Sequence, residues 1–379
     1  MKLVKVGVIG TGFIGPVHVE AVRRTGMAEV VAICGTNPQK TREKADQLGV
    51  EKAYSCYKDI IADPEIEVVH ICTPNNLHYE IAKAALLAGK HVICEKPLAL
   101  ELEQCDELIA LGKKMDKVCA VNFNMRTYPL VQQVREMIKN GELGEIFSVT
   151  GSYTQDWLML ETDYSWRVEP KYTGDTRTVA DIGSHWFDMM EYVTGLKVTE
   201  LCADFATFYK TRKRPLKPVE TYSGKMLQPG DYEEIPVETE DYSTILFHMG
   251  EKVHGTCTTC QTMAGRKNRC FFEIAGSKAM VVWDSEHCND LWIGKRDSAN
   301  GSLIKDASLM YRDSGAYTSY PGGHSEGFPD TMKHHMMRIY EDIIKRNGAD
   351  HAKFEDGKRE LEICNAAYKS ATTHQWVKL

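Results

Sequence analysis

The first 121 residues alternate short, mostly apolar segments with longer segments in which apolar residues recur at helical spacing. The apolar segments predict strands buried on both faces, at 3–9, 29–34, 67–72, 91–94 and 118–121. The intervening segments predict helices at 16–25, 38–48, 77–88 and 101–114. Strands that alternate with helices in this way are typical of a parallel, doubly wound sheet. We therefore expect an α/β domain over residues 1–121.

Beyond residue 145 the apolar residues recur at every second position. This pattern predicts successive antiparallel strands at 145–154, 198–208, 241–248, 253–263, 270–275, 278–283 and 290–293. Hairpin turns are expected at 249–252 and 275–278, a polar insert at 210–240, and helices at 329–346 and 358–375. Residues 122–379 are thus predicted to form an α+β domain with a large, mainly antiparallel open sheet for substrate binding and oligomerisation. One face of that sheet stays bare unless another subunit covers it, so we expect a homo-oligomer, a tetramer or dimer of dimers.

Composition narrows the range of partners and compartments. A net charge of −7 over 379 residues argues against a nucleic-acid or anionic-membrane surface. No apolar run reaches the roughly 20 residues of a membrane helix, and the chain starts directly with a strand rather than an export signal. Many of the 12 cysteines lie in apolar segments, which indicates buried free thiols in a reducing cytoplasm. Cys257 and Cys260 have metal-site spacing but no second pair, so no metal is expected.

A glycine-rich turn separates the first predicted strand from the first helix. Gly10, Gly12 and Gly15 form G-x-G-x-x-G: the first permits a tight turn, the second lets a pyrophosphate approach the backbone, and the third lets helix and strand pack closely. The helix that follows offers unpaired N–H groups to the phosphates. The turn, including Phe13 and Ile14, is therefore predicted to bind a dinucleotide.

Polar residues follow two later strands of this domain, those predicted at 67–72 and 91–94. Because ligands of open α/β sheets bind beyond the carboxyl ends of the strands, these residues should lie on the nicotinamide side of the cofactor. The expected cofactor contacts are Thr73, Pro74, Asn75 and His78 after one strand, and Glu95 and Lys96 after the other. Lys96 places an ammonium group in the same crevice. In the second domain, Asp181 and His185 are four residues apart and share one face of a predicted helix.

Together these motifs resemble the glucose–fructose oxidoreductase / inositol dehydrogenase / MocA-like (Gfo/Idh/MocA) family over essentially the whole chain, including 122–126. Within it the chain is similar to the branch of levoglucosan and glucoside 3-dehydrogenases, on segments 153–157, 166–167, 178–185 and 320–327. The resemblance implies an N-terminal Rossmann domain. Two positions depart from the family: residues 176–178 read Thr-Arg-Thr where many members have Gly-Gly, and Thr36 and Asn37 replace an acidic residue.

The resemblance also implies a reaction, in which a hydride passes from a secondary ring hydroxyl, at C3 of a sugar or glycoside, to NAD. His185 would be the base, because an imidazole titrates near neutrality. Lys96 would polarise the oxygen or relay the proton, and Asp181 would orient His185 or bind an adjacent hydroxyl. Asn122 is added to the cofactor contacts. The expected substrate-binding residues are Arg126, Tyr153, Gln155, Trp166, Arg167, His185 and His324.

Several alternatives stay open at this point. Thr36 and Asn37 can bind ribose hydroxyls, which favours NAD, but NADP is possible if Lys40 or Arg42 reaches a 2′-phosphate. A redox-neutral glycosidase with bound NAD begins with the same C3 oxidation, and an inositol or polyol dehydrogenase shares the motifs. A nucleotide-sensing regulator on the same fold would lack the Lys or the His, so the presence of Lys96, Asp181 and His185 counts against it. A reductase of a non-sugar also stays open. His334 and His335 are expected on the surface of a C-terminal helix.

Overall fold

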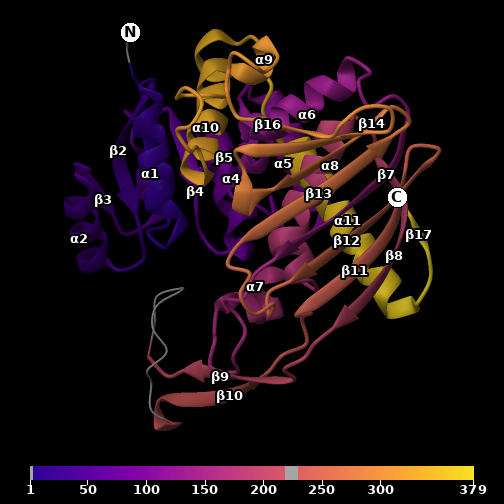
Figure 1. The fold of residues 1–379 in the computed structure, drawn as a ribbon. Helices are drawn as coiled ribbons and strands as arrows, with labels where there is room; N and C mark the ends of the chain where they lie inside the picture. The colour runs from indigo at the N-terminus through magenta and orange to yellow at the C-terminus, as the bar shows by residue number, and fades with distance from the viewer. Residues whose placement is uncertain (1–2, 218–228) are drawn as a thin grey trace. The chain divides into compact units, whose positions relative to one another are not determined.

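The computed structural model describes residues 3–217 and 229–379, and the chain divides into two compact units (Figure 1). The first, here called the N-terminal unit, contains Met1–Asn124 and Pro329–Leu361. The second, the sheet unit, contains Met125–Phe328 and Glu362–Leu379. The expected division into domains between residues 121 and 122 stays a prediction.

The N-terminal unit is built on a parallel six-stranded sheet in the order β3-β2-β1-β4-β5-β6, which confirms the predicted doubly wound fold. Its strands are β1 Val4–Ile9, β2 Ala28–Cys34, β3 Lys52–Tyr54, β4 Val68–Ile71, β5 His91–Cys94 and β6 Cys119–Val121. Its helices are α1 Ile14–Thr25, α2 Pro38–Leu48, α3 Tyr57–Ala62, α4 His78–Leu87, α5 Leu102–Lys114 and α10 Phe328–Lys345. The sequence pattern missed β3 and α3, because β3 is a short, half-buried edge strand without an apolar run.

The segment Pro329–Leu361 returns to complete the N-terminal unit. Lys353 forms an antiparallel bridge with Ala120, and the carbonyl of Ala352 accepts a hydrogen bond from Val121 at 3.1 Å. The expectation that His334 and His335 decorate the surface was wrong: both are buried in α10. The apolar face of this helix packs inward, and its histidines pack with it.

The sheet unit contains a nine-stranded sheet in the order β16-β15-β14-β13-β7-β12-β11-β8-β17. Its strands are β7 Ile146–Thr154, β8 Val198–Ala206, β11 Tyr242–Met249, β12 Val253–Cys260, β13 Arg269–Gly276, β14 Ala279–Asp284, β15 Asp290–Lys295, β16 Gly301–Ile304 and β17 Val377–Lys378. The open sheet is confirmed, with one correction to its pairing. β7 and β12 are parallel, because β7 lies between β12 and β13 instead of at the start of a meander.

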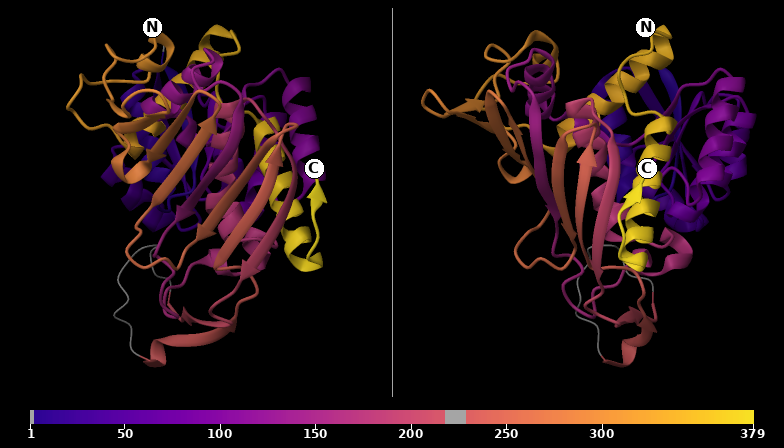
Figure 2. Two further views of the ribbon diagram at one scale, coloured as in Figure 1. Left: turned by 45° about the vertical axis from the view of Figure 1, so that its right-hand side comes forward. Right: turned by 90° about the vertical axis from the view of Figure 1, so that its right-hand side faces the viewer.

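One face of this sheet is covered by helices, as Figure 2 shows for the yellow C-terminal turns of α11 Phe354–Thr373. With α6 Pro129–Lys139 and α8 Ser184–Thr194 they form the core, in which Trp186 and Phe272 are fully buried. The opposite face presents exposed apolar side chains among polar ones, including Leu246 and Trp292.

The predicted insert at 210–240 contains a sheet of its own. β9 Thr211–Pro215 pairs in antiparallel fashion with β10 Tyr232–Pro236, and residues 218–228 lie outside the described residues. Ile235 and Val237 pack with Leu158 and Val168, so this hairpin supports the loop that follows β7. Of the helices in the described ranges, none is both long and apolar enough to cross a membrane.

Candidate functional site

The glycine-rich turn has the shape that its three glycines predict. Gly10 adopts φ +111°, and a Cβ there would lie 2.3 Å from the carbonyl oxygen of Cys72. A Cβ on Gly15 would lie 2.0 Å from the carbonyl oxygen of Gly10. At Gly12 a Cβ would meet no atom of the described chain within 4 Å. The backbone at Gly12 is therefore open to the close approach of a ligand.

The turn leads directly into the amino end of α1. The N-cap residue, Phe13, supplies no capping hydrogen bond among the described residues, and its ring is 58% exposed. The first N–H groups of a helix, when no side chain caps them, are suited to bind an anion. The turn and helix thus fit the pyrophosphate of a dinucleotide.

The end of β2 shows which side chains could contact the adenosine ribose. Asn37 caps α2, and its Oδ1 accepts a hydrogen bond from the backbone of Lys40 at 3.0 Å. Arg42 is already engaged: it donates to Asp46 at 2.7 Å and to the carbonyl of Glu51 at 2.8 Å. Arg42 is thus engaged by partners within the chain, and Lys40 is the other cation close to this turn.

The loop after β4 is tied to the loop after β5 by His78. Its Nδ1 lies 2.6 Å from the carbonyl oxygen of Pro97, and its Nε2 lies 3.0 Å from that of Thr73. Burial lowers the pKa of His78, although the two carbonyls act in the opposite direction. A neutral His78 has one N–H and can donate to only one of these carbonyls, while its buried ring packs between the Thr73 loop and the Lys96–Pro97 segment. A direct contact with the cofactor stays a prediction.

Two buried polar atoms at these strand ends have no hydrogen-bond partner within the described chain. They are Oγ1 of Thr73, after β4, and Oδ1 of Asn122, after β6. Buried polar atoms in folded proteins almost always have a partner. A ribose hydroxyl or a carboxamide NH₂ would complete both, so these residues also fit a nicotinamide nucleotide.

In the sheet unit, Asp181 and His185 stand on consecutive helical turns. Asp181 lies in a π-helical turn, Val179–Gly183, which continues into α8 with His185 in its first turn. The carboxylate of Asp181 accepts hydrogen bonds from Nε of Arg167 at 3.2 Å and from Nε2 of Gln261 at 2.7 Å. Asp181 is thus held in place by two donors. Arg167 was expected only as a substrate-binding residue, and Gln261 was not predicted at all.

Gln155 and Gln261 extend this arrangement. Oε1 of Gln155 accepts from Nε1 of Trp157 at 2.7 Å, and its Nε2 donates to Asn268 at 2.7 Å. Gln261 is fully buried, and its Oε1 has no partner among the described side chains. We call these residues the amide cluster: Gln155, Arg167, Asp181 and Gln261. The cluster includes a buried acceptor, Oε1 of Gln261, whose amide is held in position because its Nε2 donates to Asp181. Gln261 was missed because a single glutamine after a strand has no spacing signature.

The aromatic candidates lie around the same segments. Tyr153 is 5% exposed, and its ring centroid lies 6.4 Å from that of His185. The guanidinium of Arg167 lies 4.4 Å from the ring centroid of Trp166. An aromatic ring beside hydroxyl-binding groups can pack on the apolar face of a sugar.

Two predicted substrate residues have other surroundings. Two nitrogens of the Arg126 guanidinium donate to the carboxylate of Asp188: Nε donates to Oδ2 at 2.7 Å, and Nη2 donates to Oδ1. The guanidinium also packs over the ring of Tyr192. His324 is exposed on the loop before α10. Substrate contacts of Arg126 and His324 stay predictions.

The departure at residues 176–178 has a structural explanation. Arg177 is fully buried and pairs with Asp241, which Arg212 also binds at 2.8 Å. The carboxylate of Glu240 accepts hydrogen bonds from the backbone of Arg177 and Val179, both at 2.9 Å. A buried charge network thus fixes the start of the turn that carries Asp181.

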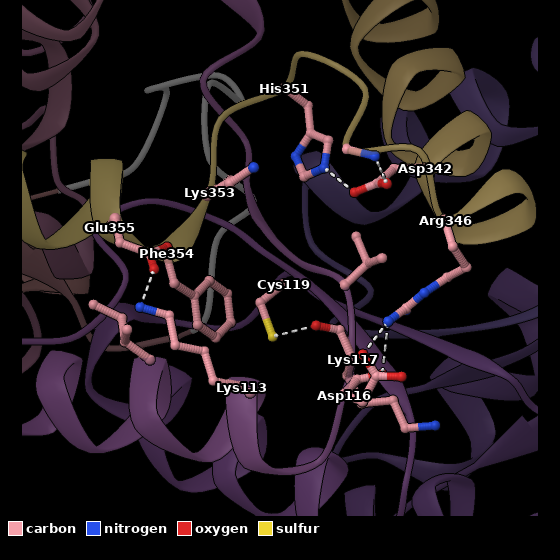
Figure 3. Close-up of a pocket in the computed structure, with 14 residues that line it drawn as sticks. Lys113, Asp116, Lys117, Cys119, Asp342, Arg346, His351, Lys353, Phe354 and Glu355 are labelled. Carbon is pink, nitrogen blue, oxygen red and sulfur yellow. Dashed lines mark hydrogen bonds and ion pairs between the residues drawn. The ribbon is translucent and has the colours of Figure 1, made fainter.

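A cavity of about 470 Å³ in the N-terminal unit lies elsewhere, at the amino end of β6 (Figure 3). Its charged rim is largely paired: Lys113 binds Glu355 at 2.8 Å, and Arg346 binds Asp116. Burial raises the pKa of the Cys119 thiol in its wall to about 12. Because cofactors bind at the opposite ends of such strands, this cavity is not part of the candidate site. No cluster of potential metal ligands occurs in 3–217 or 229–379.

Comparisons with known proteins agree with this geometry. A family model described as an oxidoreductase family with an NAD-binding Rossmann fold matches residues 4–123, and a GFO/IDH/MocA C-terminal domain model matches residues 131–282. Levoglucosan dehydrogenase of Pseudarthrobacter phenanthrenivorans is 30% identical, over 100% of this chain and 98% of its own length. D-glucoside 3-dehydrogenase of Escherichia coli is 32% identical over 50% of this chain and 54% of its own. The solved levoglucosan dehydrogenase complex with NADH and levoglucosan has a TM-score of 0.89 at 28% identity, covering 100% and 99% of the chains.

Proposed function

Because the chain belongs to the GFO/IDH/MocA oxidoreductase family and carries its NAD-binding Rossmann domain, we propose that it oxidises C3 of a sugar or glycoside to give a 3-keto-glycoside. The amide cluster is the observation that carries the substrate class. It presents a carboxylate, a guanidinium and a buried unpartnered amide oxygen within one hydrogen-bonded set, which suits adjacent hydroxyl groups. The names of the two relatives above support the same substrate class, and the name of the D-glucoside 3-dehydrogenase supports the C3 position.

Three residues would perform the proton chemistry. His185 takes the hydroxyl proton as general base, while Asp181 binds a neighbouring hydroxyl or orients the imidazole. Lys96 polarises the oxygen as the carbonyl forms. When bound, NAD accepts the hydride that leaves C3 with its bonding electron pair. The hydroxyl proton and the hydride together account for the two hydrogens that the substrate loses.

NAD is the cofactor that the end of β2 favours over NADP. Asn37 and Thr36 are neutral and could bind ribose hydroxyls, and Arg42 is engaged by Asp46. Lys40 would be the one route to a 2′-phosphate from this turn. Discrimination between the two nucleotides should therefore be modest.

The test is a panel of substrates followed at the absorbance of reduced nicotinamide. Levoglucosan, aryl O- and C-glucosides, free glucose and inositols are compared, and we expect NADH formation with pyranosides. A 3-deoxy-glucoside should give no NADH, whereas the 2-deoxy analogue should react. Turnover of the 3-deoxy analogue would overturn the C3 assignment. Absence of NADH formation with every substrate of the panel, together with absence of aglycone release, would overturn the proposal.

The same panel separates the alternatives. Aglycone release without net NADH would identify a redox-neutral glycosidase, whose first step is the same C3 oxidation. Turnover of inositols in preference to pyranosides would identify a polyol dehydrogenase. The amide cluster favours the sugar because it contacts an aromatic pair, Trp157 and Trp166, that could cover a pyranose face.

We also propose a homo-oligomer, built on the face of the nine-stranded sheet that no described helix covers. Leu246 and Trp292, which are 46% and 39% exposed, lie on outward-facing positions of β11 and β15. A monomer by light scattering at micromolar concentration would contradict this. A cytoplasmic location is the compartment consistent with twelve free cysteines.

A further inference from the structure

A chain of hydrogen-bonded side chains crosses the interior of the N-terminal unit. Nε2 of His18, on α1, lies 2.9 Å from Oε1 of Glu95, and its Nδ1 lies 2.8 Å from Nδ1 of His70. Nε2 of His70 lies 2.7 Å from the hydroxyl of Tyr340 on α10. The side chains of His18, His70 and Tyr340 are fully buried. This row of hydrogen bonds therefore ends at Glu95, the residue that directly precedes Lys96.

Glu95 is anchored on both oxygens. Nδ2 of Asn122 donates to Oε1 at 2.5 Å, and the backbone of Lys96 donates to Oε2 at 3.3 Å. Burial alone would raise the pKa of Glu95, but the hydrogen bond and charge of His18, with the charge of Lys96 and the bond from Asn122, lower it to about 2. Glu95 is thus a carboxylate, which can only accept hydrogen bonds.

The carboxylate determines which nitrogens carry hydrogen. Nε2 of His18 must donate to Glu95, and a single hydrogen lies between the two Nδ1 atoms. Burial holds the pKa of His70 well below its usual range, so His70 carries one N–H. A neutral His18 then accepts from His70, which accepts from Tyr340. A protonated His18 donates to His70, which donates to Tyr340. Both ring nitrogens of His18 and both ring nitrogens of His70 have a partner in either arrangement, so these hydrogen bonds hold the His18 ring in place whichever applies.

We propose that His18 is a positioning residue for hydride transfer. It holds the Glu95 carboxylate against the backbone N–H of Lys96, while His70 and Tyr340 hold the His18 ring. This inference rests on the proposed function, because that function gives Lys96 its chemical role. Packing alone does not explain the chain: three apolar side chains would fill the same space without burying polar groups. A polar network is retained where it fixes a functional group, as the partners of catalytic residues commonly do.

The test compares His18→Leu, which removes both hydrogen bonds, with His18→Gln, whose amide can still donate to Glu95 and accept from His70. In His18→Leu we expect kcat to fall about 10- to 100-fold, because small misplacements of a reacting group have effects of that size. The KM for the glycoside and the dissociation constant of NADH should stay within about threefold. His18→Gln should recover most of kcat, and Tyr340→Phe should lose less than His18→Leu.

His91→Leu is the matched control for a merely structural role. His91 is a partly buried histidine of the same unit, at the amino end of β5, and its Nδ1 accepts a hydrogen bond from the backbone N–H of Val118 at 2.9 Å. Its replacement should lower the melting temperature and leave kcat unchanged. If His18→Leu and His91→Leu lose stability and activity alike, or if His18→Leu keeps the wild-type kcat, the proposal is overturned.

A second readout is the pH profile of kcat in Glu95→Gln. Loss of a negative charge beside an ammonium makes that ammonium easier to deprotonate, so the alkaline limit of activity should move to lower pH. The other titratable groups around Glu95 are His18, His78 and the thiols of Cys72 and Cys94, whose pKa values burial raises. Those thiols are neutral over the range tested. An unshifted profile would contradict the proposal.

Failure of the proposed function can be recognised separately. If wild-type protein oxidises no glycoside, the backbone amide signal of Lys96 and the ring ¹⁵N signals of His18 are recorded by NMR in the substrate-free protein. His18→Leu should displace the Lys96 signal, and His91→Leu should not. An unmoved Lys96 signal would remove the positioning role whatever the substrate is.

Discussion

In the N-terminal unit the ligand-binding turn is made of backbone, whereas in the sheet unit the candidate sugar-binding groups are side chains that other side chains hold. At Gly12 the main chain is open to a ligand, and among the described residues no side chain caps the N–H groups of the first turn of α1. Asp181, by contrast, depends on Arg167 and Gln261, and its turn depends on the buried pair of Arg177 and Asp241. A backbone site tolerates changes of side chain nearby, while a site held by side chains can be altered by a single distant substitution. The following experiments test this difference, from the largest expected effect to the smallest.

Lys96→Ala and His185→Ala remove one proposed proton-handling group from each unit. Each should lower kcat by about 10²- to 10⁴-fold, the usual range for a general acid or base. NADH binding, measured by fluorescence, should persist in both, because neither belongs to the glycine-rich turn. Turnover near the wild-type rate in either variant would remove that residue from the mechanism.

Asp241→Ala should unfold the support of the amide cluster. It leaves two buried guanidinium groups, those of Arg177 and Arg212, without their carboxylate, which typically lowers the free energy of unfolding by about 3–5 kcal/mol. Glu286→Ala breaks the exposed pair with Arg266 and is the control, with an expected loss under about 1 kcal/mol. Chemical denaturation compares the two variants. Equal losses would show that burial of the network has no special weight.

Gly12→Ala and Gly10→Ala separate ligand approach from folding. At Gly12 the new methyl meets no described atom, so the melting temperature should stay unchanged while NADH binding weakens at least about tenfold, or about 1.4 kcal/mol. At Gly10 the methyl meets the Cys72 carbonyl at φ +111°, so the protein itself should be destabilised. Wild-type NADH affinity in Gly12→Ala would contradict the backbone site.

Acid should destabilise the N-terminal unit before the sheet unit. Burial lowers the pKa values of His70, His78 and His91, that of His91 to about 4. Below pH 6.5 these histidines bind protons in the unfolded chain but stay neutral in the folded protein. The free energy of unfolding therefore decreases as the pH drops from 6.5 toward 4, by on the order of 1–3 kcal/mol for His91. Asp241, with a lowered pKa, weakens the sheet unit only below about pH 3.8.

The tryptophans make this difference measurable. All six lie in the sheet unit, so their fluorescence reports on that unit alone. Hydrogen exchange in β1 and β4 reports on the other. We expect exchange in the N-terminal strands to accelerate near pH 5 while tryptophan fluorescence stays native. Simultaneous loss of both signals would mean that the two units unfold together.

Asn37→Asp should have the smallest effect. A carboxylate at this position would repel a 2′-phosphate by about 1–3 kcal/mol for a partly buried pair, and so sharpen the preference for NAD. Binding of NAD and NADP to both proteins is compared by fluorescence or calorimetry. Tighter binding of NADP than NAD by the wild type would reverse the assignment and implicate Lys40.

The sequence predicted the parts of the molecule that depend on local spacing. G-x-G-x-x-G is a local signature, and so is the pair Asp181 and His185, because four residues make one helical turn. The parallel pairing of β7 with β12 was not predictable, since the pattern of a strand does not name its neighbour. His18 was missed for a related reason: its partners lie 52 and 77 residues away along the chain.

The buried charges of the sheet unit were unpredictable in the same way. Arg177 stands in the sequence as a departure from a glycine pair. Nothing near it indicates that the Asp241 carboxylate neutralises it and also binds Arg212. Burial of Arg126 beside Asp188 was equally hidden. Long-range pairs of this kind need coordinates.

The return of α10 to the N-terminal unit has a consequence for synthesis on the ribosome. Tyr340, His335 and Ala352 contact strands that were translated hundreds of residues earlier. Until they emerge, the hydroxyl that pairs with His70 and the carbonyl that pairs with Val121 do not exist, although the glycine-rich turn has long left the exit tunnel. The N-terminal unit therefore lacks these partners for as long as the ribosome is translating residues 125–328. A stop codon placed just before α10 should yield chains that depend on chaperones and are degraded, even though they contain every strand of the six-stranded sheet.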